Sequence, residues 1–159
     1  MHKFLNRESA PERQVPGLFE KSELLYRFVI LYYSYCTKPR DYGFGIPLSM
    51  IEAHSITFID DNPGVTISQL AAHYRRTTSA VSQMATKLEK KGLITRKMVT
   101  NLKNIHLYST PTGHTLSQNH KQYDRETAQH SQDSLSDRFT QEEIDTFFKV
   151  LQEYTSRFE

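Results

Sequence analysis

The stretch TISQLAAHYRRTTSAVSQMATKLEKKGLITRKMVTNLKNIHLYSTPTG, residues 66–113, carries the start and stop signals of two short helices. It opens with a capping box, in which the Thr66 hydroxyl and the Gln69 side chain each satisfy a backbone N–H at the start of a helix. A second helix is predicted over about 78–91. Gly92 suits the position just beyond its last turn, where glycine commonly ends a helix.

An alternating pattern follows the second helix. Residues 93–97 and 105–109 are predicted to form two short strands around a basic tip. The second helix begins at Thr77 or Thr78, and its predicted apolar face consists of Val81, Met84 or Ala85, and Leu88. Two helices followed by a hairpin are the elements of a winged helix-turn-helix. The expected fold is therefore mainly α with a small β wing.

The same residues resemble the MarR family of bacterial transcription regulators. The matching segments read QLA, AVSQ, KLEKKGLI and STPTG, at residues 69–71, 80–83, 87–94 and 109–113. The last segment is similar to the Leu-Thr-x-x-Gly motif of that family. The chain departs from the family at the wing, where Asn101-Leu102-Lys103 replaces the usual Asp-x-Arg. The resemblance implies a two-fold homodimer with one winged helix on each side.

Two helices are predicted ahead of this unit. The first covers 18–36 and is apolar around much of its circumference, so it must be buried on more than one side. A loop marked by one Pro and two Gly follows over 38–45. The next helix is predicted over about 47–60, with Pro47 at its first position, which tolerates the missing N–H of proline.

Two more helices are predicted after the wing. Thr110 and Pro111 open a long, polar helix as N-cap and first residue. Thr140 begins a second capping box, and the helix behind it has an apolar stripe made of Ile144, Phe147, Phe148, Leu151, Tyr154 and Phe158. The stripe recurs with the helical period. The segments 18–36 and 140–158 are therefore predicted to form a helical dimerisation region completed by a second protomer.

A single domain is expected for residues 1–159, because this length suits one domain or one protomer of a dimer. Within it, the winged helix-turn-helix lobe is assigned to 46–110 and the dimerisation helices to 18–45 and 111–159. The lone Cys36 excludes an internal disulfide framework. No apolar run is long enough to span a membrane and no signal-peptide pattern opens the chain, so the cytoplasm is the expected compartment.

Basic residues concentrate in the predicted lobe. Between residues 73 and 106, eight Lys or Arg residues stand against a single acidic residue, Glu89, although the net charge of the whole chain is only +2. Such asymmetry is typical of a surface that binds a polyanion. A solvated helix face is the alternative interpretation, but here the charges coincide with the second helix and the wing.

Side chains suited to duplex DNA lie on the second helix and the wing. Short hydroxyls, an amide and a cation at successive helical positions are typical of a helix in the major groove, and wing cations are typical of a minor-groove contact. The candidates are Arg76, Thr77, Thr78, Ser79, Ser82, Gln83, Thr86, Lys87, Arg96, Lys97 and Lys103. Gln83 is the best candidate for reading an adenine.

The sequence gives little indication of a small-molecule site. The resemblance implies a small aromatic or phenolic effector, with Tyr33, Tyr35 and Tyr42 as candidate pocket residues, although core packing is the plainer interpretation of these tyrosines. No nucleophile elbow, phosphate loop or paired-carboxylate signature is present, so an enzyme is not expected.

A metal site is the boldest hypothesis from the sequence. His120 and Asp124 lie four residues apart on one helix face, and Cys36 and His54 add two side chains that bind zinc well. His54 and His120 also fall where zinc-sensing members of the family place ligands. A regulatory zinc ion is the one cofactor that the sequence raises. The alternative interpretation is that the histidines are simply solvated and that Cys36 is a small core residue.

These patterns together predict a sequence-specific transcriptional regulator, most often a repressor in the resembled family. It would act as a homodimer on a pseudo-palindromic double-stranded operator, and an effector would release it. The alternative is an architectural DNA-binding or protein-interaction module that senses nothing. A membrane partner is not expected.

Overall fold

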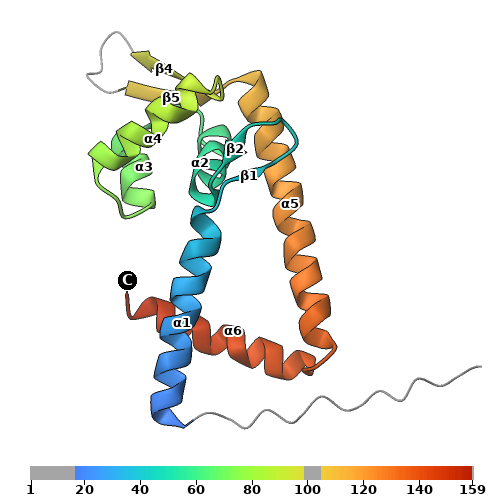
Figure 1. The fold of residues 1–159 in the computed structure, drawn as a ribbon. Helices are drawn as coiled ribbons and strands as arrows, with labels where there is room; N and C mark the ends of the chain where they lie inside the picture. The colour runs from blue at the N-terminus through green and yellow to red at the C-terminus, as the bar shows by residue number, and fades with distance from the viewer. Residues whose placement is uncertain (1–16, 99–104, 159) are drawn as a thin grey trace, which may run out of the picture. The chain divides into compact units, whose positions relative to one another are not determined.

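The computed structural model describes residues 17–98 and 105–158 (Figure 1). The chain divides into two compact units, which meet between Thr37 and Lys38. Helix α1 (Leu18–Thr37) makes up the described part of the first unit, as the sequence predicted. None of the helices in the described ranges has the length and apolarity needed to cross a membrane.

The second unit is mainly helical and carries two small antiparallel sheets, which confirms the expected fold class. Its elements are β1 (Arg40–Asp41), β2 (Pro47–Leu48), α2 (Met50–Asp61), β3 (Val65–Thr66), α3 (Ile67–His73), α4 (Thr78–Lys90), β4 (Ile94–Met98), β5 (Ile105–Ser109), α5 (Pro111–Ser136) and α6 (Gln141–Ser156). Strand β1 pairs with β2, and the three-stranded sheet has the order β3-β5-β4. The wing is the hairpin of β4 and β5.

Side-chain caps fix where the helices begin. The predicted capping boxes at Thr66 and Thr140 are both present, with Gln69 and Glu143 as their reciprocal partners. Thr77 caps α4 by accepting a hydrogen bond from the Ala80 N–H. Each cap satisfies backbone donors that have no partner inside the helix. The sequence signals therefore place these three helix starts correctly.

The segment before α2 differs from the prediction. Pro47 does not begin a helix but lies in β2, where Asp41↔Pro47 and Arg40↔Leu48 are paired with β1. The helix begins at Met50, because Ser49 and Glu52 form a capping box that satisfies its first turn. The stretch predicted as a plain loop is thus partly a short hairpin, whose tip residues donate three backbone N–H groups to the Asp41 carboxylate.

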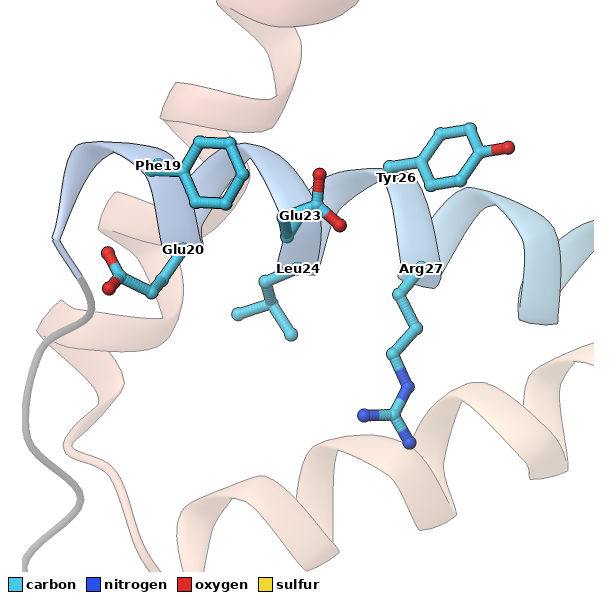
Figure 2. A pocket seen from close by; sticks show the side chains of 6 residues that line it. All are labelled: Phe19, Glu20, Glu23, Leu24, Tyr26 and Arg27. Atoms are coloured by element: carbon cyan, nitrogen blue, oxygen red, sulfur yellow. The ribbon is translucent and has the colours of Figure 1, made fainter.

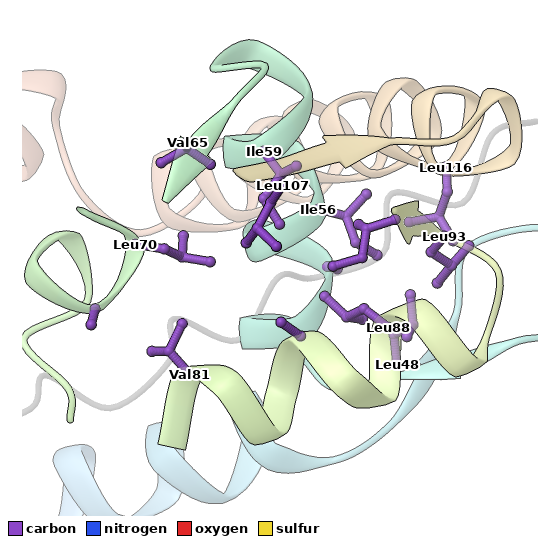
Figure 3. Packing of buried hydrophobic residues seen from close by; sticks show 14 of the residues in the cluster. Leu48, Ile56, Ile59, Val65, Leu70, Val81, Leu88, Leu93, Leu107 and Leu116 are labelled. Carbon is purple, nitrogen blue, oxygen red and sulfur yellow. The ribbon is translucent and has the colours of Figure 1, made fainter. Parts of the chain in front are cut away.

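The core of the second unit is built around α2 (Figure 3). In that view, apolar side chains from α2, α4 and β5 point toward one another, and Leu116 of α5 joins them. The fully buried large residues include Leu48, Ile56, Ile59, Leu70, Leu88, Leu93, Ile94, Leu107 and Leu116. Burying each such side chain stabilises the fold by about 1.5–3 kcal/mol. The winged helix and the start of α5 therefore share one hydrophobic core.

The start of α5 is tied closely to the end of α4. Gly92, with φ of +71°, ends α4 as predicted, and the next residue, Leu93, offers its carbonyl to the Thr110 N–H at 3.0 Å. The Thr110 hydroxyl donates to the Gly92 carbonyl at 2.7 Å and also accepts from the Gly113 N–H at 3.0 Å. These bonds close the wing at its base and fix the first turn of α5 beside Leu93.

A carboxylate makes a second tie at this junction. Asp60 of α2 accepts a hydrogen bond from the Ser109 hydroxyl at 2.6 Å and lies 3.0 Å from Nδ1 of His114. Burial acts to raise the pKa of Asp60, but the hydrogen bonds from Ser109 and His114 outweigh it and leave the pKa below its ordinary value. The carboxylate is therefore ionised at neutral pH and holds α2 to the β5–α5 connection.

The apolar faces of the outer helices stay exposed in the single chain. Helix α1 has no buried residue among those described, and Ile144 is the buried residue of α6. The exposed large side chains on these two helices include Leu24, Phe28, Leu31, Phe147, Phe148 and Tyr154. Each of these helices thus exposes more large apolar side chains than is usual in a soluble monomer.

The close approach at Leu93 gives a stability prediction. A Cβ on Gly113 would overlap the Leu93 carbonyl oxygen, which is backbone and has little room to move. We expect Gly113→Ala to lower the free energy of unfolding by about 1–3 kcal/mol, the usual cost of overpacking a tight contact. Urea unfolding followed by circular dichroism measures this effect. Thr112→Ala, at an exposed neighbouring position, is the control, and equal stabilities of the two variants would contradict the steric account.

Candidate nucleic-acid interface and a histidine cluster

Helix α4 presents a polar face opposite its buried one. Val81, Ala85 and Leu88 are buried, as the sequence predicted, with Ala85 and not Met84 at the centre of the face. The solvent-facing candidates are Thr78, Ser79, Gln83 and Lys87, all exposed, while Ser82 and Thr86 are half-buried. The exposed hydroxyls, the amide and the cation can meet base edges and phosphates without rearrangement.

An open hollow of about 380 Å³ lies beside this face. It is lined by the starts of α3 and α4 and by β5: Thr66, Ile67, Ser68, Thr78, Ser79, Ser82 and Ile105. The sequence singled out Thr78, Ser79 and Ser82 but missed Ser68 and Ile105. Ser68 lies in the first turn of α3, and its place beside α4 depends on packing between the two helices. Hydroxyls at two helix starts suit a backbone phosphate.

The Arg96 side chain has a different orientation from the one expected. It was expected to point from the wing toward DNA, but its Nη2 donates to the Ser82 carbonyl at 2.9 Å and to the Thr86 hydroxyl at 2.7 Å. Its Nε also lies 3.3 Å from Oε2 of Glu89. The guanidinium is therefore turned back onto α4. Thr86 is engaged in the same contact, and its hydroxyl is not free for a base.

Other cations keep the expected exposure. Lys97 is exposed on β4, with its Nζ 4.9 Å from the centre of the Tyr108 ring, a cation–π contact. Arg76 is exposed in the turn between α3 and α4, next to Arg75, whose φ is +49°. Lys103 lies outside the described residues. Exposed cations thus lie on α4 at Lys87, in the turn before it at Arg76 and on the wing strand after it at Lys97.

Three of the four predicted metal ligands come together. One ligand atom from each of His54, His120 and Asp124 lies within 4.8 Å of the others. The His54 and His120 rings, on α2 and α5, are 4.6 Å apart between centres, and Nδ1 of His120 is 3.4 Å from a carboxylate oxygen of Asp124. Two imidazoles and a carboxylate are a donor set suited to zinc.

His120 occupies an unusual environment for a histidine. Its side chain is 1% exposed, and neither ring nitrogen has a hydrogen-bond partner in the described residues. The Tyr42 ring lies 5.0 Å away between centres. Desolvation lowers the pKa of His120, although the Asp124 charge acts in the opposite direction. A buried ring with two unused nitrogens normally requires an explanation.

The remaining candidates lie elsewhere. Cys36 is half-buried near the end of α1, in the other compact unit, and is not among the three clustered ligands. Tyr42 is buried in the core, with its ring against His120 and 5.4 Å from that of Tyr123. Tyr33 and Tyr35 are exposed on α1. The structure therefore does not bring the three tyrosines into one pocket within either unit.

A groove on α1 is the other hollow of note (Figure 2). The picture shows Phe19, Glu20, Glu23, Leu24, Tyr26 and Arg27 fanning out from the first turns of this helix. All of its lining residues come from α1. Ligand pockets bury most of their ligand between convergent walls, and one helix face supplies no opposite wall. The groove is therefore not a candidate effector site.

Comparison with known proteins agrees with this architecture. Residues 48–101 match the model of the MarR family. A Bacillus subtilis protein named as a helix-turn-helix-type transcriptional regulator, YhjH, is 31% identical over 105 residues, which cover 65% of this chain and 59% of that protein. The match thus spans less than two thirds of the length of this relative.

Solved structures of similar fold cover most of the chain. Streptococcus pneumoniae FabT in complex with DNA is 23% identical, with a TM-score of 0.65 over 89% of this chain and 94% of its own. Lactococcus lactis ZitR, described as a zinc-responsive MarR family member, is 18% identical, with a TM-score of 0.69 over 90% of this chain and 100% of its own. The fold is that of these winged-helix structures. The match to the MarR family model lies within it, over residues 48–101.

Proposed function

We propose that this protein is a transcriptional regulator that binds double-stranded DNA as a homodimer. The observation that carries the proposal is the polar face of α4, where Thr78, Ser79, Gln83 and Lys87 are exposed. A helix with this composition fits the major groove, and a neighbouring hairpin with a cation fits the adjacent minor groove. Repression of transcription is the expected outcome of operator binding.

The match of residues 48–101 to the MarR family model supports the same proposal. FabT, similar in fold, was solved in complex with DNA, and YhjH is named as a transcriptional regulator. Two copies of α4 in a two-fold dimer would enter successive major grooves, about 34 Å apart. The operator is therefore expected to be a pseudo-palindrome.

Selection of genomic fragments by the purified protein tests the proposal. A regulator is expected to prefer its selected operator over a mixed-sequence duplex of equal length by about 10³-fold or more at physiological salt. An architectural DNA-binding module would bind both duplexes alike, and a protein-interaction module would bind neither. Fluorescence anisotropy at several salt concentrations separates the three outcomes.

Base reading is assigned to Gln83. We expect Gln83→Ala to weaken operator binding by about 1–3 kcal/mol and to relax selectivity at one base pair in each half-site, because a side-chain amide can make two hydrogen bonds to adenine. Lys97→Ala is the matched control: it should weaken operator and mixed duplex equally and reduce the salt dependence. Anisotropy titrations on operator variants measure both. Equal weakening of all sequences by Gln83→Ala would refute the base-reading role.

Dimer formation is proposed to use the exposed apolar faces of α1 and α6. Phe147, Phe148 and Tyr154 are each roughly half exposed on α6, and Leu151 lies on the same stripe. Their spacing keeps them on one side of the helix. Burial of this stripe against a second copy removes apolar surface from water, which is the main driving force for association.

A charge placed in the stripe should separate the protomers. We expect Leu151→Asp to convert the dimer into a monomer at micromolar concentration and to abolish tight operator binding, since a buried carboxylate without a partner is strongly unfavourable. Sedimentation equilibrium is the measurement. Thr146→Asp adds the same charge on the opposite side of α6 and should leave the dimer intact. A wild-type chain that sediments as a monomer would rule the proposal out.

A metal-responsive role is the second candidate, and the cluster of His54, His120 and Asp124 favours it. These side chains would hold a zinc ion with two nitrogens and one oxygen, and the ion would link α2 to α5. Three protein ligands leave one position of a tetrahedral site open for a further ligand. Zinc is then the favoured effector, since Tyr42, one of the three tyrosines assigned to an aromatic effector, is buried in the core.

Zinc binding is directly measurable on chelator-treated protein. We expect calorimetry to give about one zinc ion per chain at micromolar affinity or tighter, and zinc loading to change operator affinity. His120→Ala should remove the binding, because it deletes one of the three ligands. His130→Ala, at an exposed position of the same helix, is the control. Uptake that persists unchanged in His54→Ala and His120→Ala would dispose of this site.

A further inference from the structure

Two neighbouring cations of the wing are used in different ways. Arg96 and Lys97 are consecutive residues of β4, so their side chains point to opposite faces of the sheet. Lys97 is exposed and lies over the Tyr108 ring. The Arg96 side chain is only 21% exposed and lies against α4. The two basic residues are equivalent in the sequence, but the structure separates them.

The contacts of Arg96 all lie along one side of α4. Ser82, Thr86 and Glu89 are spaced by four and three residues, which brings them onto the same helix face. One guanidinium nitrogen donates to the Ser82 carbonyl and to the Thr86 hydroxyl, while another faces the Glu89 carboxylate. The planar guanidinium can serve three acceptors at once, and the single ammonium of a lysine cannot copy that geometry.

The partner Glu89 matters for the charge of the interface. It is the single acidic residue between 73 and 106, the segment that carries eight Lys or Arg residues. Its side chain is 42% exposed, and it lies on the same helix as the DNA-facing residues. Without Arg96, an uncompensated carboxylate would face an approaching phosphate backbone. Like-charge placement of this kind opposes binding.

We infer that Arg96 is a positioning residue and not a DNA contact. It holds the wing hairpin against α4 and neutralises Glu89, so that the helix and the wing reach the duplex in a fixed relative orientation. The inference deepens the proposed DNA binding and rests on it. The direct contact of this strand with DNA is then left to Lys97.

The salt dependence of binding separates positioning from direct contact. Removing one ionic interaction with a phosphate lowers the slope of log K against log salt by about 0.9. We expect Arg96→Met and Arg96→Lys to weaken binding to the selected operator by about five- to twentyfold with an unchanged slope. Lys97→Met, the matched control on the adjacent residue, should lower the slope by about one unit per protomer.

The partner on α4 gives an independent check. If Arg96 acts through Glu89, Arg96→Met should cost less affinity in a Glu89→Gln background than in the wild type, because no carboxylate is left uncompensated there. If Arg96 contacted phosphate directly, Arg96→Met would cost the same affinity in both backgrounds. Equal costs, a lowered slope, or wild-type affinity in Arg96→Lys would each overturn the inference.

A measurement without DNA keeps this inference separate from the proposed function. Arg96→Met should speed amide hydrogen exchange in β4 and β5 of the free protein, since the hairpin loses its tie to α4, while Lys97→Met should not. Unchanged exchange in β4 and β5 would overturn the docking role even if operator binding falls. Failure of the wild-type protein to bind any duplex would instead refute the proposed function. The exchange data would then still test whether Arg96 holds the wing hairpin against α4.

Discussion

The structure of the winged-helix lobe depends on the backbone junction at Leu93. The Leu93 carbonyl accepts a hydrogen bond from the Thr110 N–H. Because Gly113 has no side chain, α5 can lie close to this carbonyl. Because Leu93 directly follows Gly92, which ends α4, this one junction joins α4, the wing and the long helix α5. Any larger residue at 113 would push α5 away from the core that Leu93 and Leu116 share.

Local signals are sufficient to predict most of the fold. Caps at Thr66, Thr77, Thr110 and Thr140 act within four residues of themselves, so their sequence patterns are complete in a short window. The predicted start of α2 is wrong because Pro47 suits two structures, a first helical position and an edge strand. The capping pair Ser49 and Glu52 decides between them, and it is a local signal that the prediction from Pro47 overlooks.

Features that depend on distant residues are harder to predict. Strand β3 is two residues long, and it exists because Val65 pairs with Leu107, forty-two positions away. The turn of Arg96 onto α4 likewise depends on how the wing packs, since its partners lie on another element. The His54–His120–Asp124 cluster needs the α2–α5 packing, which in the sequence is indicated only by the resemblance to other proteins. The pattern of helical residues alone leaves such pairings open.

The same helix that makes the Leu93 junction also carries the histidine cluster. His120 follows Gly113 by seven residues, about two helical turns or roughly 10 Å along α5. An ion held between His54 and His120 would therefore fix α2 against α5 close to the point where α5 is joined to the wing. A ligand shifts a conformational equilibrium only through its different affinity for the two states. Zinc would change DNA affinity to the extent that the spacing of α2 and α5 differs between the DNA-bound and free protein. The hydrophobic core that α2, α4 and the start of α5 share is the physical reason to expect such coupling.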